Sequence, residues 1–101
     1  MRINWNNLEE TTRLAEQGDA AAQYLLGRMY YHGHRNYLKR DRRTALKWWR
    51  LAAESGHIEA LCSLGHRHLA RGQYPNAIEC FRRAADMGHN KARALLDECG
   101  L

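Results

Sequence analysis

The sequence contains little that would interrupt a helix or span a membrane. Its 101 residues include a single proline, Pro75, and no apolar run approaches the length of a membrane span. The N-terminal residues MRINWNNLEETTR lack the hydrophobic stretch of a secretory signal. No segment alternates between polar and apolar residues as a strand does. These absences predict an all-α protein located in the cytoplasm.

Cysteine is also scarce, since the chain has only Cys62, Cys80 and Cys99. Three is an odd number, and all three fall within helical patterns rather than at the spacing of a disulfide framework. We therefore expect reduced thiols. A length of 101 residues suits one domain with its own core, and it is too short for an enzyme with a separate substrate domain.

An internal repeat is the strongest positive feature. Residues 44–64 read TALKWWRLAAESGHIEALCSL, and residues 76–96 read NAIECFRRAADMGHNKARALL. The small, bulky and glycine positions recur with a shift of 32 residues, as from Ala45 to Ala77, and an earlier segment recurs with a shift of 38, as from Gly18 to Gly56. Repetition at such periods is typical of stacked helical units, each of which needs its neighbours to bury its apolar face.

Apolar residues within each unit lie at helical spacing, with glycines where the helices end. Asp19 and Asp41 are suited to cap the helices that follow them, and Pro75 fits a first helical turn. Gly18, Gly56 and Gly88 each close an alanine-containing run. The pattern predicts six helices, over Asn7 to Gln17, Asp19 to His32, Arg42 to Ser55, His57 to Arg71, Pro75 to Met87, and His89 to Cys99.

The segment LGRMYYHG and the pattern D-x-x-x-A-L-K-W-W-x-x-A-A-x-x-G-H-x-x-A resemble the Sel-one-like repeat, a relative of the tetratricopeptide repeat. The resemblance implies a short right-handed solenoid of antiparallel helix pairs. We expect repeat units at about 19–56 and 57–88, flanked by capping helices at 6–18 and 89–101, and hence a complete chain. The segment from Gly33 to Asp41 is about two residues longer than the family's usual spacing, and it forms either a basic rim or a disordered connector.

The resemblance also implies a concave groove that holds partner segments, lined by the first helix of each pair. Tyr24, Arg28 and Tyr31 are the residues expected to matter most, because tyrosine and arginine dominate interface hot spots. The alternative for Tyr31 is that it merely packs against the next helix. By the repeat register, the groove residues are Tyr24, Arg28, Tyr31, His32, Glu59, Cys62, His66, Leu69 and Lys91.

Positive charge is in excess, with 16 Lys and Arg against 11 Asp and Glu. The excess is concentrated between residues 35 and 50, which contain seven basic residues and one acidic residue, Asp41. This segment could steer an acidic partner or hold a nucleic-acid backbone. Trp48 and Trp49 fall at packing positions, which disfavours base stacking. The expected basic rim consists of Arg35, Lys39, Arg40, Arg42 and Arg43.

The candidates for a metal site or a catalytic site are Cys62 and His66, which lie four residues apart on one helical face. His68 is near, and His32 and His34 lie by the long loop, but a zinc site needs three or four converging ligands. A nucleophile also needs a base and a third group to orient it. We therefore expect no metal, no cofactor and no enzymatic activity. The sequence favours a non-enzymatic module that binds a protein partner, with a nucleic-acid-associated protein as the alternative. Self-association would extend the small surface of so few repeats.

Overall fold

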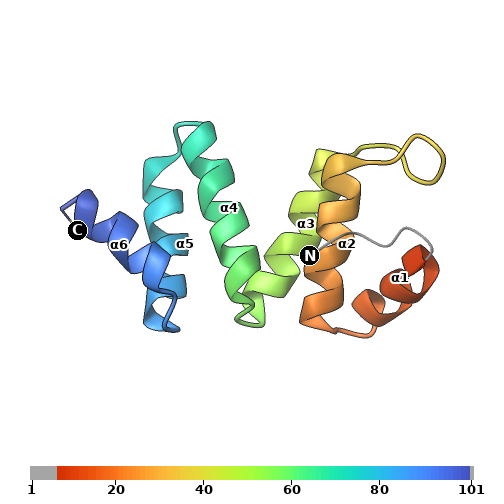
Figure 1. Ribbon diagram of the computed structural model, residues 1–101, viewed down its shortest axis with the longest axis horizontal. Coiled ribbons are helices and arrows are strands. Elements are labelled where there is room, and N and C mark those ends of the chain that lie inside the picture. The colour runs from red at the N-terminus through yellow and green to blue at the C-terminus, as the bar shows by residue number, and fades with distance from the viewer. Residues whose placement is uncertain (1–6, 101) are drawn as a thin grey trace. The chain divides into compact units, whose positions relative to one another are not determined.

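The computed structural model describes residues 7–100, which form six α-helices and no named strand (Figure 1). The predicted all-α class is confirmed, and each predicted helix end lies at the observed end or one residue from it. Residues 6 and 101 of the expected capping segments lie outside the described residues. The helices are α1 (Leu8–Glu16), α2 (Ala20–His32), α3 (Arg42–Glu54), α4 (Ile58–Ala70), α5 (Tyr74–Asp86) and α6 (Asn90–Glu98).

The observed helix ends have the capping residues that the sequence predicts. The Asp19 side chain accepts a hydrogen bond from the Ala22 N–H at 2.9 Å, and Asp41 accepts one from the Thr44 N–H at 3.1 Å. Gly18, at the turn between α1 and α2, has a φ of +98°, which a residue with a Cβ adopts only under strain. Pro75 lies in the first turn of α5, as expected. These caps fix both the lengths of the helices and the turns between them.

The chain divides into two compact units, the first ending at His57 and the second starting at Ile58. In the first unit, α2 packs against α1 on one side and α3 on the other. Small and apolar side chains of all three helices are buried. Of the two tryptophans predicted at packing positions on α3, Trp49 is buried and Trp48 is partly buried. The buried apolar residues are Ala15, Ala22, Leu26, Met29, Ala45, Trp49, Ala52 and Ala53.

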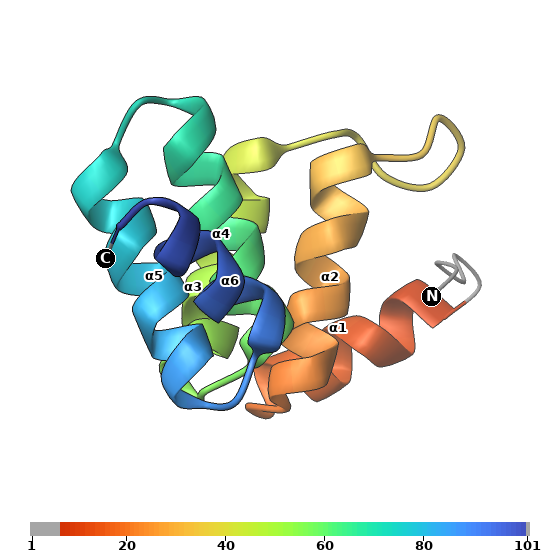
Figure 2. The same cartoon turned by 60° about the vertical axis from the view of Figure 1, so that its left-hand side comes forward.

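In the second unit, α5 packs against α4 and α6 (Figure 2). Alanines again make up much of the buried set, and Phe81 is the large aromatic side chain among the buried residues of this unit. The buried set of this unit is Ala60, Leu61, Leu64, Ala77, Phe81, Ala84, Ala85, Ala92 and Leu96. Each unit is therefore a helix pair with one further helix packed on it.

A glycine facing an aromatic ring sets the spacing of each central helix pair. A Cβ at Gly27 would overlap Cδ1 and Nε1 of Trp49, and it would lie 3.1 Å from the Ala45 carbonyl oxygen. A Cβ at Gly65 would lie 2.7 Å from Cζ of Phe81. Only glycine leaves room for these rings. The Trp49 ring therefore packs directly against the α2 backbone in the first unit, and the Phe81 ring packs directly against the α4 backbone in the second.

Backbone hydrogen bonds hold the long loop between α2 and α3 in place. His34 and Leu38 exchange two backbone bonds, of 2.7 Å and 2.9 Å, around a tight turn. The Asp41 N–H donates to the Tyr30 carbonyl at 2.7 Å, which ties the end of the loop to α2. A Cβ at Gly33 would lie 2.7 Å from the Arg40 nitrogen, so the two ends of the loop are in close contact. The loop has a defined backbone, unlike the disordered connector considered above.

None of the helices among residues 7–100 combines the length and apolar character that crossing a membrane requires.

Replacing Gly27 by alanine tests the close approach. In an ordinary helix interior this change stabilises by up to about 1 kcal/mol, because alanine has the higher helix propensity. Here the added methyl group overlaps the Trp49 ring, and we expect a loss of about 1–3 kcal/mol in the free energy of unfolding. Urea denaturation followed by circular dichroism measures the change. A Gly27→Ala protein as stable as the wild type, or more stable, would contradict the packing described.

Candidate functional site

Four of the predicted groove residues lie on α2 in the first unit. Tyr24, Arg28 and Tyr31 are half-buried, and His32 is exposed at the end of the helix. They recur at helical spacing along the part of α2 that packs beside α3. The structure therefore brings these four residues onto one helix surface.

Ring contacts with α3 and the turn after it hold both tyrosines in place. The Tyr24 ring lies 4.8 Å from the His57 ring, and the Tyr31 ring stacks on Trp49 with centroids 5.1 Å apart. The guanidinium carbon of Arg42 lies 4.7 Å from the Tyr31 ring centroid, in a cation–π contact. The packing alternative for Tyr31 is therefore partly correct, because its ring contacts α3. We call Tyr24, Tyr31, Arg42, Trp49 and His57 the α2–α3 aromatic cluster.

The buried indole of Trp49 anchors this cluster. Its Nε1–H donates a hydrogen bond to the Tyr24 carbonyl oxygen at 3.2 Å, so the polar atom of the ring has a partner within the unit. A satisfied buried donor avoids the cost of desolvation without a bond. Trp49 is thus fixed against α2, and the tyrosines that rest on it have a rigid support.

In the second unit, residues of α4 and α5, and of α6 with the turn before it, line a partly open pocket of about 240 Å3. Three predicted groove residues line it, namely Cys62, His66 and Lys91, whereas Glu59 and Leu69 do not. The His66 ring meets the Phe81 ring edge-on at 5.2 Å. The residues that line the pocket are Cys62, His66, Phe81, His89, Lys91, Ala92 and Leu95.

The partner of Cys62 in this pocket is His89 rather than His66. The Cys62 sulfur lies 3.7 Å from Nδ1 and 3.8 Å from Nε2 of His89. A sulfur equally distant from both nitrogens in the ring plane would overlap the ring carbons, so it lies over the ring face. The lone pair of Nδ1 accepts the Ala92 N–H at 3.1 Å, which makes His89 the N-cap of α6.

This geometry is that of packing rather than of nucleophilic catalysis. A catalytic thiol needs an in-line hydrogen bond to its base and a low pKa. Burial raises the pKa of the Cys62 thiol, and the charges of Glu59 and Cys80 raise it further. Within residues 7–100, no group of three or more His, Cys, Asp and Glu side chains is placed to hold a metal ion.

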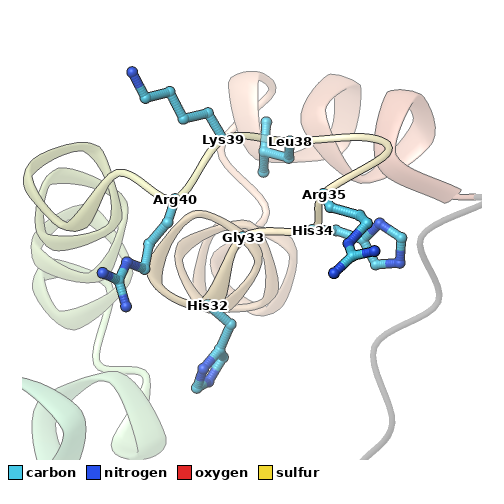
Figure 3. A pocket seen from close by; sticks show the side chains of 7 residues that line it. All are labelled: His32, Gly33, His34, Arg35, Leu38, Lys39 and Arg40. Carbon is cyan, nitrogen blue, oxygen red and sulfur yellow. The ribbon is translucent and has the colours of Figure 1, made fainter.

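The loop between α2 and α3 forms an open pocket of about 450 Å3, shown in Figure 3. No carboxylate lines it. The lysine and arginine side chains do not converge on one point, because Lys39 projects to one side of the loop and Arg40 to another (Figure 3). The lining residues are His32, Gly33, His34, Arg35, Leu38, Lys39 and Arg40.

The five residues of the predicted basic rim therefore lie in different surroundings. Arg35, Lys39 and Arg40 line the loop pocket. Arg42 lies over the Tyr31 ring, and the exposed Arg43 follows it on α3 near the Asp41 carboxylate. Hydrogen bonds from the Thr44 hydroxyl and backbone N–H to that carboxylate lower the pKa of Asp41. The five residues are thus divided between the loop pocket and the first turn of α3.

Comparison with known proteins agrees with the repeated geometry. The Sel1 repeat model matches residues 20–57 and 58–89. The chain belongs to the Sel1 repeat family. A similar solved structure is that of c5321, a protective antigen of uropathogenic Escherichia coli strains with an SLR fold, at 35% sequence identity and a TM-score of 0.77. The match covers 85% of this chain and 19% of c5321. No curated protein matches the sequence.

The two Sel1 repeats place different side chains at equivalent positions. A shift of 38 residues relates Tyr24 to Cys62, and a shift of 32 relates His57 to His89. The contact between Tyr24 and His57 in the first repeat is thus replaced by the contact between Cys62 and His89 in the second. The recurrence of the histidine was visible in the sequence, but its role as a helix cap and as the wall of a pocket was not.

The cysteines of the second Sel1 repeat offer a direct check of this environment. Burial raises the pKa of both Cys62 and Cys80, whereas Cys99 is exposed. Since the thiolate is the reactive form, we expect iodoacetamide at pH 8 to alkylate Cys99 at least about tenfold faster than Cys62. Peptide mass spectrometry after timed quenching measures the three rates, and an unfolded sample gives the reference. Equal rates in the folded protein would contradict the burial described.

Proposed function

We propose that this Sel1-repeat chain is a non-enzymatic protein-interaction module, an adaptor, regulator or inhibitor that binds a segment of a partner protein. The proposal rests mainly on the α2–α3 aromatic cluster. Tyr24 and Tyr31 keep part of their surface exposed while His57 and Trp49 hold their rings in place. Such rings offer large contact area, and little side-chain freedom is lost on binding.

Cationic side chains beside the cluster indicate the charge of the partner. Arg28 lies between the tyrosines on α2, and Arg42 lies over Tyr31. The chain carries a formal net charge of +5. We therefore propose an acidic partner segment, which the basic loop residues Arg35, Lys39 and Arg40 help to attract.

The second repeat contributes its own contacts to the proposed interaction. His66 and Lys91 line the pocket of that unit together with Cys62. Glu59 is exposed on α4, and Leu69 is half-buried further along the same helix. The three free cysteines suit a reducing compartment, and the proposed place of action is the cytoplasm.

A nucleic-acid-associated protein remains the alternative, because the loop pocket has basic side chains and no carboxylate. Two observations weigh against it. Trp49 is buried and Trp48 packs against the core of the first unit, so neither offers a free ring for base stacking. The cationic side chains of the loop also splay apart instead of following one line (Figure 3).

Affinity purification from a nuclease-treated lysate of the native host tests the proposal. We compare the tagged wild type with a Tyr24→Ala/Arg28→Glu variant, which removes one anchor and reverses one charge. Hot-spot residues contribute about 2 kcal/mol or more each, so we expect at least about a hundredfold weaker binding of the captured partner. Quantitative mass spectrometry, followed by titration of the purified partner, measures the loss.

Two matched controls accompany the double variant. Tyr24→Phe keeps the ring and should retain the partner, and Lys47→Glu makes the same charge change at an exposed residue of α3. Circular dichroism confirms that each variant is folded. A partner indifferent to Tyr24→Ala/Arg28→Glu would contradict the proposal. Capture of nucleic acid that is lost on charge reversal at Arg40, Arg42 and Arg43, with a steep salt dependence, would favour the alternative.

A further inference from the structure

The pocket of the second unit corresponds to a space that a side chain fills in the first unit. Tyr24 and Cys62 occupy equivalent repeat positions, as do His57 and His89. In the first unit the Tyr24 ring lies on His57 at 4.8 Å. In the second unit the Cys62 thiol reaches the face of His89 but fills much less volume than a phenol ring.

The walls of this space are also equivalent in the two units. Trp49 lies 6.4 Å from the Tyr24 ring in the first unit, and its counterpart Phe81 lines the pocket in the second. Both large rings lie against a glycine of the preceding helix, Gly27 or Gly65. The second unit therefore keeps the aromatic wall and the histidine that hold a tyrosine in the first unit, but it lacks the tyrosine itself.

The size and lining of the pocket suit a single aromatic side chain. A volume of about 240 Å3 is smaller than the 300–1,000 Å3 or so typical of small-molecule sites. Apolar side chains of Phe81, Ala92 and Leu95 line the pocket, and the His89 ring, which carries the Cys62 sulfur over one face, forms part of its wall. Lys91 is the one lysine or arginine in the lining, and a ring tolerates a neighbouring cation because its face is electron-rich.

We propose that this pocket receives a tyrosine or phenylalanine side chain of the partner protein, which packs beside the Cys62 thiol against His89 and Phe81, where the first unit has the Tyr24 ring between His57 and Trp49. The inference deepens the proposed function, since it rests on the chain binding a protein. It adds that the partner segment carries an aromatic residue for the second repeat. Cys62, by being small, keeps the site open.

The experiment uses the whole chain and p-cresol, the side-chain analogue of tyrosine, as the probe. Heteronuclear NMR follows the backbone and histidine ring signals during titration with p-cresol or with 3-methyl-1-butanol, an aliphatic control. We expect saturable shifts at Phe81, His89 and Leu95 with p-cresol, with a dissociation constant on the order of 1–10 mM. The aliphatic alcohol should bind at least about tenfold more weakly.

Two substitutions at one position sharpen the test. Cys62→Tyr places in the pocket the ring that the first repeat has there, and it should abolish the p-cresol shifts while leaving the melting temperature unchanged or raised. Cys62→Ser keeps the pocket open and should retain the shifts. Shifts that persist in a folded Cys62→Tyr protein would overturn the proposal. So would the absence of saturable shifts at His89 and Phe81 in the wild type, a result that needs no variant to fold.

The titration contains no partner, so its outcome is separate from that of the proposed function. A partner captured through Tyr24 and Arg28 by a protein that does not bind p-cresol would leave the interaction module intact and refute only the aromatic pocket. With a purified partner, Cys62→Tyr should weaken binding at least about tenfold relative to Cys62→Ser. Equal affinities of the two variants would also refute the pocket.

Discussion

The contact of one large aromatic ring with one bare glycine backbone organises each unit of this protein. Trp49 lies against Gly27, and Phe81 lies against Gly65, in spaces that a Cβ would fill. Helices of 9 to 13 residues are marginal by themselves, so they depend on such packing for their stability. The ring sets how closely the two helices approach, and the surrounding alanines can then pack with little exposed surface.

The same contact determines which side chains remain at the surface. Trp49 packs against α2 at Gly27. Tyr24 lies one turn before Gly27 on this helix and its ring contacts His57, and Tyr31 lies one turn after Gly27 and its ring stacks on Trp49. The second repeat has the same frame around Phe81, but Cys62 replaces the tyrosine and a pocket results. The same helix packing therefore holds the Tyr24 ring in the first unit and leaves a pocket at the equivalent position in the second unit. This difference is the physical basis of the two complementary contacts with a partner that we propose.

The helices and caps could be predicted from the sequence because they depend on local patterns. Asp19 and Asp41 cap as expected, and the helix ends lie within one residue of the prediction. The site was less predictable, because it depends on which side chains meet across helices. Sequence spacing paired Cys62 with His66 on one helix, whereas packing brings it to His89, 27 residues away. Likewise, the basic residues from 35 to 43 lie close together in the sequence, whereas the loop directs Lys39 and Arg40 to different sides and α3 places Arg42 over Tyr31.

Native-state hydrogen exchange tests most directly the claim that each unit is held together around its glycine and its ring. The account predicts that the slowest amides lie in α2 and α3 around Gly27 and Trp49, and in α4 and α5 around Gly65 and Phe81. The ends of α1 and α6 should exchange much faster, because fewer buried side chains hold them. NMR detection assigns each protected amide to its residue. Slowest exchange in α1 or α6, or uniform rates across all the helices, would contradict the account.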